Sequence, residues 1–145
     1  MSADSVVFDP SDAPRDGKAW REWFRGLQEA ELPDEGEFER LTPSLRAWYD
    51  AMITRFPDFI RTETDDPNGM DYSLMGSAIL FDMPRGPGDF DEAEKFASQQ
   101  AKNLGLGTYD IMSDDGRKGR HIVFPDGPLP NPPSFFSKLF GKAKD

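Results

Sequence analysis

Short apolar runs alternate along the chain with segments in which apolar residues recur every three or four positions. The short runs predict strands, because aromatic and β-branched residues are concentrated in them and they show no helical period. The predicted strands are residues 6–8, 72–81, 108–112 and 121–124. The run PRGPG at 84–88 breaks the chain after the second strand. The turn sequence SDDG at 113–116 predicts that the last two strands form a hairpin.

Three longer segments have the apolar periodicity of helices. They cover residues 17–30, 43–56 and 91–104, and each presents one apolar stripe. Capping residues mark the helix ends: Asp16, Thr42 followed by Pro43, and Asp89 or Asp91 at the N-termini, and Pro57 and Gly105 at the C-termini. We therefore expect a strand, two helices, a strand, a helix and two final strands.

This order predicts an α/β (α+β) fold. We expect a two-layer sandwich with a mixed sheet of about four strands and three main helices largely on one face. If the strands on either side of the third helix are parallel, their connection should be a right-handed crossover. The apolar stripes and strands predict this core: Trp20, Phe24, Trp48, Met52, Phe56, Leu80, Phe96, Leu104, Tyr109 and Ile111.

The C-terminal part of the chain differs from the rest. We interpret residues 1–124 as a single domain and 125–133 as a Pro-rich linker, because five prolines in nine residues exclude a regular element. Residues 134–145 form a short amphipathic segment with three Lys and one Asp, a net charge of +2, which leaves −12 for the preceding residues. Its large apolar side chains are Phe135, Phe136, Leu139 and Phe140.

An apolar patch of this kind is usually covered in a soluble protein. Burial and charge favour docking of residues 134–145 onto the acidic body of the same chain. A partner, a second copy and a membrane surface are the alternative docking sites, the last disfavoured by the negative charge of the rest of the protein. Deleting the segment should lower the melting temperature if it docks on its own domain.

The composition excludes several classes of site. The 145 residues contain no Cys and a single His, which rules out disulfides, thiolate chemistry and multi-histidine metal sites. No run of 18 apolar residues is present, and the N-terminus lacks the basic and apolar regions of a signal peptide. We therefore expect a cytoplasmic protein without a transmembrane segment.

The net charge of −10 bears on possible partners. An acidic surface repels the phosphates of nucleic acids, so we expect no nucleic acid binding. It would also accelerate encounter with a basic protein. The simpler interpretation is that the charge keeps the protein soluble.

Candidate catalytic and metal-binding groups have simpler structural interpretations. Two carboxylate clusters can be considered for a divalent cation, but they lack the spacing of an EF-hand loop: Asp65, Asp66 and Asp71, and Asp110, Asp114 and Asp115. His121 could form an acid–base pair with Asp110 if their strands are adjacent, although a lone histidine at the start of a strand is usually structural. We predict no catalytic residue, no cofactor and no metal site.

Carboxylates are concentrated in the predicted connections, while the helices use their apolar stripes for the core. Loops on a rigid scaffold are common binding elements. This predicts a protein-binding surface formed by Glu31, Asp34, Glu35, Glu37, Glu39, Asp65, Asp66, Asp71, Asp114 and Asp115.

Several segments also resemble a family of small, uncharacterised bacterial proteins. They are VVFDPSDAPRD before a tryptophan-rich helix, TPSLRAWYDAMITRFP, DYSLMGSAILFDM and AEKFASQQAKNLGLGTYDIMSDDG, and together they cover most of residues 5–124. Similar segments occur in immunity proteins encoded beside polymorphic or contact-dependent toxins. The resemblance implies a non-catalytic protein that neutralises a cognate toxin by occluding it, with a basic toxin domain as a candidate partner.

The resemblance supplies no catalytic residues, and toxin identity does not transfer within such families. Two alternatives stay open. The chain could be a small enzyme or metabolite-binding protein whose site forms only in the folded state, or an accessory protein of another assembly.

Overall fold

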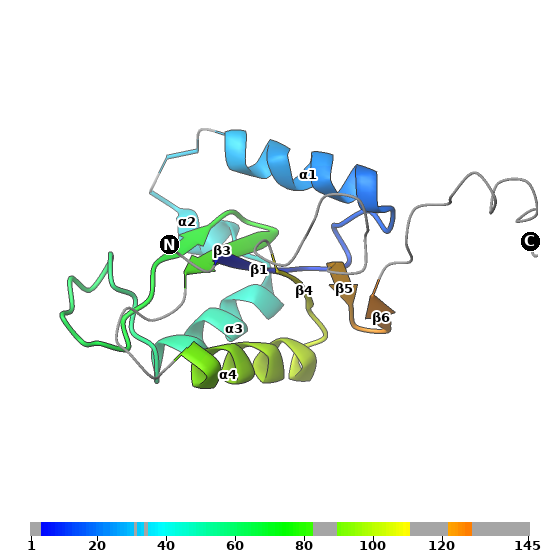
Figure 1. Cartoon of the computed structure of the whole chain (residues 1–145). Coiled ribbons are helices and arrows are strands. Elements are labelled where there is room, and N and C mark those ends of the chain that lie inside the picture. The colour runs from blue at the N-terminus through cyan, green and yellow to red at the C-terminus, as the bar shows by residue number, and fades with distance from the viewer. Residues whose placement is uncertain (1–3, 31, 34, 83–89, 111–121, 129–145) are drawn as a thin grey trace, which may run out of the picture.

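The structure is a computed structural model that describes residues 4–30, 32–33, 35–82, 90–110 and 122–128 (Figure 1). Its elements are β1 (Asp4–Phe8), α1 (Gly17–Glu29), α2 (Glu37–Arg40), α3 (Pro43–Ile53), β2 (Tyr72–Leu74), β3 (Ala78–Asp82), α4 (Phe90–Asn103), β4 (Gly107–Asp110), β5 (Ile122–Phe124) and β6 (Gly127–Pro128). The α+β class is confirmed. Within the described ranges, no helix combines the length and apolarity needed to cross a membrane.

Within the described residues, the sheet contains six strands in the order β2-β3-β1-β4-β5-β6. Each neighbouring pair is antiparallel, so the predicted mixed sheet of about four strands is corrected in both respects. Because β3 and β4 are both antiparallel to β1, they run parallel to each other with β1 between them. The two strands that flank α4 are therefore separated by β1, the first strand of the chain. The expected antiparallel pairing of the last two predicted strands is confirmed as β4 with β5.

One extra strand arises because the apolar segment 72–81 is a hairpin rather than one strand. The chain reverses at Gly76, which has a φ of +80°. Contacts with remote segments hold this turn: the Thr42 amide donates to the Gly76 carbonyl at 3.2 Å, and the Asp9 amide donates to the Ser77 carbonyl at 2.9 Å. The turn thus depends on tertiary hydrogen bonds as well as on its own residues.

A second extra strand lies inside the segment 125–133, where we predicted no regular element. Gly127 and Pro128 form β6, which pairs with β5. Proline is compatible with this position because β6 is the last strand of the sheet formed by the described residues, and proline is tolerated in edge strands. Residues 129–145, including the predicted amphipathic segment, lie outside the described residues.

Helices cover both faces of the sheet, so the molecule has three layers instead of the predicted two (Figure 1). Val6 and Phe8 of β1 pack with α1, whereas Val7, between them, packs with α3 and α4. All three side chains are fully buried. A strand that is apolar at successive positions must be covered on both sides, which is why one layer of helices is not enough.

The predicted helix ends are largely confirmed, but α3 ends at Ile53 with Thr54 as its C-cap and does not continue to Pro57. Asp16 Oδ2 accepts a hydrogen bond from the Ala19 amide at 2.9 Å, and Thr42 Oγ1 accepts one from the Leu45 amide at 3.4 Å. Gly105 follows α4 with a φ of +70°, the left-handed conformation expected of a C-terminal cap. Asp91 lies inside α4 and is not its N-cap; Asp89, the other candidate, is outside the described residues.

Most of the predicted core is buried. Trp20, Phe24, Trp48, Met52 and Phe56 are at most 5% exposed. Four others are only partly buried and pack against the edges of the two core clusters: Leu80, Phe96, Leu104 and Tyr109. Ile111 lies outside the described residues.

Candidate functional site

A buried carboxylate organises the turn that follows α3. Asp58 is 1% exposed. Its side chain accepts hydrogen bonds from the Tyr49 hydroxyl at 2.7 Å, from the amides of Ile60 and Arg61 at 3.1 and 3.0 Å, and from Arg61 Nη1 at 2.9 Å. A buried carboxylate with this many donors holds the backbone of residues 58–61 in one conformation.

Arg61 connects this turn to a distant part of the chain. Its Nη1 also donates to the Tyr72 carbonyl at 2.7 Å, and its Nη2 forms an ion pair with the carboxylate of Glu37, the first residue of α2. The side chains of Arg61 and Glu37 are 23% and 19% exposed, so this ion pair is largely shielded from water. Arg61 thereby fastens α2 to the segment after α3.

The electrostatics of this network favour one protonation state. Burial, and then the hydrogen bond to Asp58, raise the pKa of the Tyr49 hydroxyl well above its usual value, which keeps it protonated as a donor. Burial also raises the pKa of Tyr72, whose hydroxyl donates to the Phe56 carbonyl at 2.6 Å. Burial alone would lower the pKa of Arg61, but its bonds to Glu37 and Asp58 outweigh that effect and raise it.

The two segments joined by Arg61 carry most of the carboxylates that we predicted to bind a partner. We call the described residues of 32–40 and 58–71 the acidic surface. Figure 1 shows α2 and the loop that follows α3 at the same end of the molecule, beside the β2–β3 hairpin. Six of its carboxylates are exposed: Glu35, Glu39, Glu63, Asp65, Asp66 and Asp71. Segments far apart in the sequence therefore form one negatively charged region.

The acidic surface also exposes large apolar side chains. Ile60 is 54% exposed and Leu32 is 53% exposed. Of its two arginines, Arg61 is paired with the carboxylates of Asp58 and Glu37, whereas Arg40 keeps its positive charge and donates to the carbonyls of Glu35 and Pro33. The surface thus offers carboxylates and aliphatic side chains to a partner.

The predicted interface residues have different positions in the structure. Glu35, Glu39, Asp65, Asp66 and Asp71 are exposed on the acidic surface. Glu37 is half-buried in the ion pair with Arg61 and stabilises the surface from within. The remaining four lie outside the described residues: Glu31, Asp34, Asp114 and Asp115.

Sequence reasoning did not identify Asp58, Arg61 and Tyr49 as a network. Pro57-Asp58 follows the helix stripe and is typical of a helix stop. The sequence contains one local indication of this network. Asp58 precedes Arg61 by three residues, a spacing at which one turn brings a carboxylate and a guanidinium together. The contact with Glu37 spans 24 residues and has no local signature.

The proposed cation and acid–base sites gain no support from the described residues. In the parts of the chain that the structure describes, no group of three or more His, Asp and Glu side chains lies close enough together to hold a metal ion. His121, the candidate partner of Asp110, lies outside them. The acidic surface combines exposed carboxylates and aliphatic side chains with the hydrogen-bonded support of Asp58 and Arg61.

The sequence matches no protein-family model, and comparisons with curated proteins and with solved structures return no match. A function for this chain therefore has to be proposed from the physical properties of its surfaces.

Proposed function

We propose that this protein is a non-catalytic binding protein that occludes a basic protein partner, in the manner of an immunity protein that neutralises its cognate toxin. The observation that carries the proposal is the Arg61 network, which fastens two acidic segments into a single surface. A partner that meets this surface contacts both segments at once, so their charges act together.

The composition of the acidic surface suits protein recognition. Specific interfaces combine apolar contacts with a polar rim, and Ile60 and Leu32 supply exposed aliphatic side chains on a surface that carries six exposed carboxylates. The carboxylates attract a basic domain over a distance of about 10 Å at ordinary salt concentrations and accelerate its association.

The support beneath the surface favours rigid docking. Asp58 is fixed by four hydrogen-bond donors and Arg61 by three acceptors, all from described residues. A surface that is ordered before binding loses less conformational entropy on association, which increases affinity without additional contacts. Occlusion requires only shape and charge, and this surface provides both.

The experiment begins with the open reading frames that neighbour this gene. Each is expressed alone to identify a product that inhibits growth, and then together with this protein to test whether growth is restored. Restored growth by direct binding is the expected result. If no neighbouring product is neutralised by this protein, the immunity function is wrong.

Association kinetics with the neutralised product then test the surface. Glu35, Asp65 and Asp66 are changed together to Lys; Glu37 is left intact because it supports the fold. The matched control changes Glu22, Asp50 and Glu92, which are exposed on α1, α3 and α4, to Lys and alters the net charge equally. We expect the first variant to associate at least about tenfold more slowly with a weaker salt dependence, and the control to change much less. Equal effects of the two variants would show that only net charge matters.

A further inference from the structure

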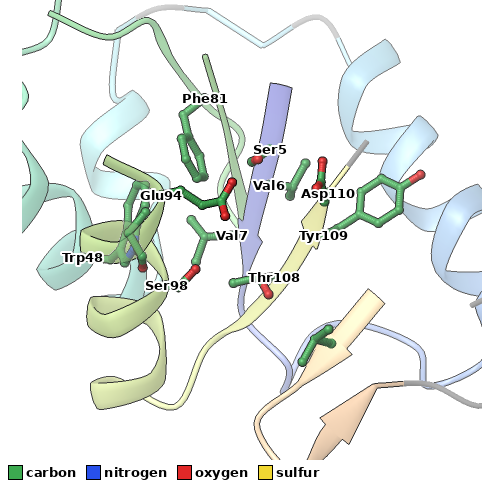
Figure 2. A pocket seen from close by; sticks show the side chains of 12 residues that line it. Ser5, Val6, Val7, Trp48, Phe81, Glu94, Ser98, Thr108, Tyr109 and Asp110 are labelled. Atoms are coloured by element: carbon green, nitrogen blue, oxygen red, sulfur yellow. The ribbon is translucent and has the colours of Figure 1, made fainter. Parts of the chain in front are cut away.

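A pocket lies between α4 and the sheet, on the face opposite α1 (Figure 2). Its volume is about 210 Å³. The floor is apolar and aromatic, formed by Val7, Trp48 and Phe81, and α4 contributes Glu94 and Ser98 from one wall. The opposite wall comes from β1 and β4, where Thr108 pairs with Val7 in the sheet.

The pocket exists because α4 presents small side chains to the sheet at this point. Ala97 and Ser98 face β1 and β4. The pair Val7 and Thr108 is followed along these two strands by the more polar pair Ser5 and Asp110. Trp48 does not fill the space, because its indole Nε1 donates to the Ala97 carbonyl at 3.1 Å. The indole is thereby anchored against α4 and lies fully buried in the floor of the pocket.

Among the described residues that line the pocket, the polar groups are hydroxyls and carboxylates, and none of these residues is basic. Figure 2 shows the Glu94 carboxylate extending between Phe81 and Val7 toward β1. Asp110 already takes part in another interaction, so charge recognition in the pocket depends on Glu94. The hydroxyls of Ser98 and Thr108 can accept further hydrogen bonds.

We propose that this pocket binds a small organic cation, a primary amine carried on an apolar or aromatic body. Glu94 would accept the hydrogen bonds of the ammonium group, while the exposed side chain of Val123 and the accessible edge of Phe81 would contact the apolar body. An empty cavity of about 150 Å³ holds benzene, so 210 Å³ accommodates a phenyl ring with a short aminoalkyl arm.

This site is separate from the acidic surface. None of the residues that line the pocket belongs to 32–40 or 58–71. The amine site therefore does not rest on the proposed partner, and each can fail without the other.

The test compares three ligands of one shape by isothermal titration calorimetry with the full-length protein. They are phenethylamine, the neutral 2-phenylethanol and the anionic phenylacetate. We expect saturable binding of the amine at one site and binding at least about tenfold weaker for the neutral and anionic ligands, because only the amine pairs with Glu94.

Two matched variants locate the amine. Glu94→Gln keeps the shape and removes the charge, and should weaken binding of phenethylamine about tenfold. Glu92→Gln is the control on the same helix, with an exposed carboxylate 3.9 Å from Arg55, and should leave binding unchanged. Equal affinity for the amine and 2-phenylethanol, or an unchanged affinity in Glu94→Gln, would overturn the proposal.

A third variant fills the pocket. Ser98 is exposed at the wall, so Ser98→Phe places a ring in the space without replacing a buried core residue. Circular dichroism checks that this variant is folded, and we expect it to lose phenethylamine binding. Wild-type binding by folded Ser98→Phe, or no saturable binding of any of the three ligands to the wild type, would also refute the amine site.

Discussion

The two faces of the sheet are both lined with aromatic side chains, but they are stabilised differently. On the α1 face, rings pack on rings: Phe8 lies 5.1 Å from Trp20 and 5.1 Å from Phe124 between ring centroids. The α3/α4 face has similar ring contacts, and there the polar atoms of the rings are hydrogen-bonded as well. Trp48 donates to the Ala97 carbonyl, Tyr49 to Asp58 and Tyr72 to the Phe56 carbonyl.

The tryptophans show the difference most clearly. Trp20 and Trp48 are both fully buried, on opposite faces. The indole nitrogen of Trp20 has no hydrogen-bond partner among the described residues, whereas that of Trp48 has one. Trp20 therefore contributes mainly buried area, while the hydrogen bond of Trp48 also fixes its position against α4. Both candidate binding sites depend on residues of the second face or on the turn that follows α3.

The largest expected effect is the loss of either tryptophan. Trp20→Ala and Trp48→Ala should each lower the free energy of unfolding by about 3–5 kcal/mol, because each leaves a large cavity in a closed core. Urea denaturation with circular dichroism measures both. A loss below about 1 kcal/mol for Trp20→Ala would mean that α1 is not an essential layer, and the comparison of two cores would fail.

Removing the buried carboxylate should have the next largest effect. Asp58→Ala leaves the Tyr49 hydroxyl without its acceptor and removes one of the two acceptors of Arg61 Nη1, and should cost about 3 kcal/mol. The control is Asp50→Ala, because Asp50 is exposed and lies 3.6 Å from exposed Arg46; it should cost less than about 1 kcal/mol. Similar losses for the two variants in urea denaturation would contradict a structural role for the network.

A substitution in β4 tests how tightly the α1 face is packed. Gly107 pairs with Phe8, and a Cβ atom at position 107 would overlap the Phe8 ring. Gly107→Ala should therefore destabilise the protein by about 1–3 kcal/mol.

Gly26 supplies the matched control for that substitution. It lies within α1, and a Cβ atom there would meet nothing within 4 Å. Gly26→Ala should stabilise the protein by about 0.5–1 kcal/mol, since alanine is the better helix former. Thermal unfolding of the two variants should therefore shift in opposite directions, and a shift in the same direction would show that the ring can move away from Gly107.

The smallest effect sharpens the comparison of the tryptophans. Trp20→Phe removes a buried donor that has no described partner, whereas Trp48→Phe removes a donor that is hydrogen-bonded to α4. Trp48→Phe should therefore cost about 1 kcal/mol more than Trp20→Phe. Equal costs in denaturant titrations would mean that the bond to Ala97 does not contribute to stability.

Features that depend on neighbouring residues could be predicted from the sequence. Asp16 and Thr42 cap their helices through amides three residues away, and Gly105 adopts the left-handed conformation that glycine tolerates best. The apolar stripe that contains Trp48 and Met52 predicted a buried helix face for the same reason, since the helical period alone brings those residues together.

The layers were predicted incorrectly although the sequence contained a signal for them. Val6, Val7 and Phe8 are apolar without alternation, as are residues 78–81. A strand covered on one face usually alternates between apolar and polar residues, and an unbroken run indicates cover on both faces. An apolar run predicts a strand whether or not it alternates, and the alternation shows only how many faces of the strand are covered. The strands were therefore predicted correctly, while the second layer of helices was not.

The sequence by itself determined α1, α3 and α4 with the caps Asp16, Thr42 and Gly105, most of the strands, the aromatic residues of the core and the negative charge, but not the short helix α2. Only the tertiary structure decided the hairpin at Gly76, the order of the strands, the pairing of Arg61 with Glu37 and the pocket beside Glu94. The physical reason is the range of the interactions. A cap or an apolar stripe is complete within one or two turns of chain, whereas these four features join atoms of segments that only the packed sheet and helices bring together.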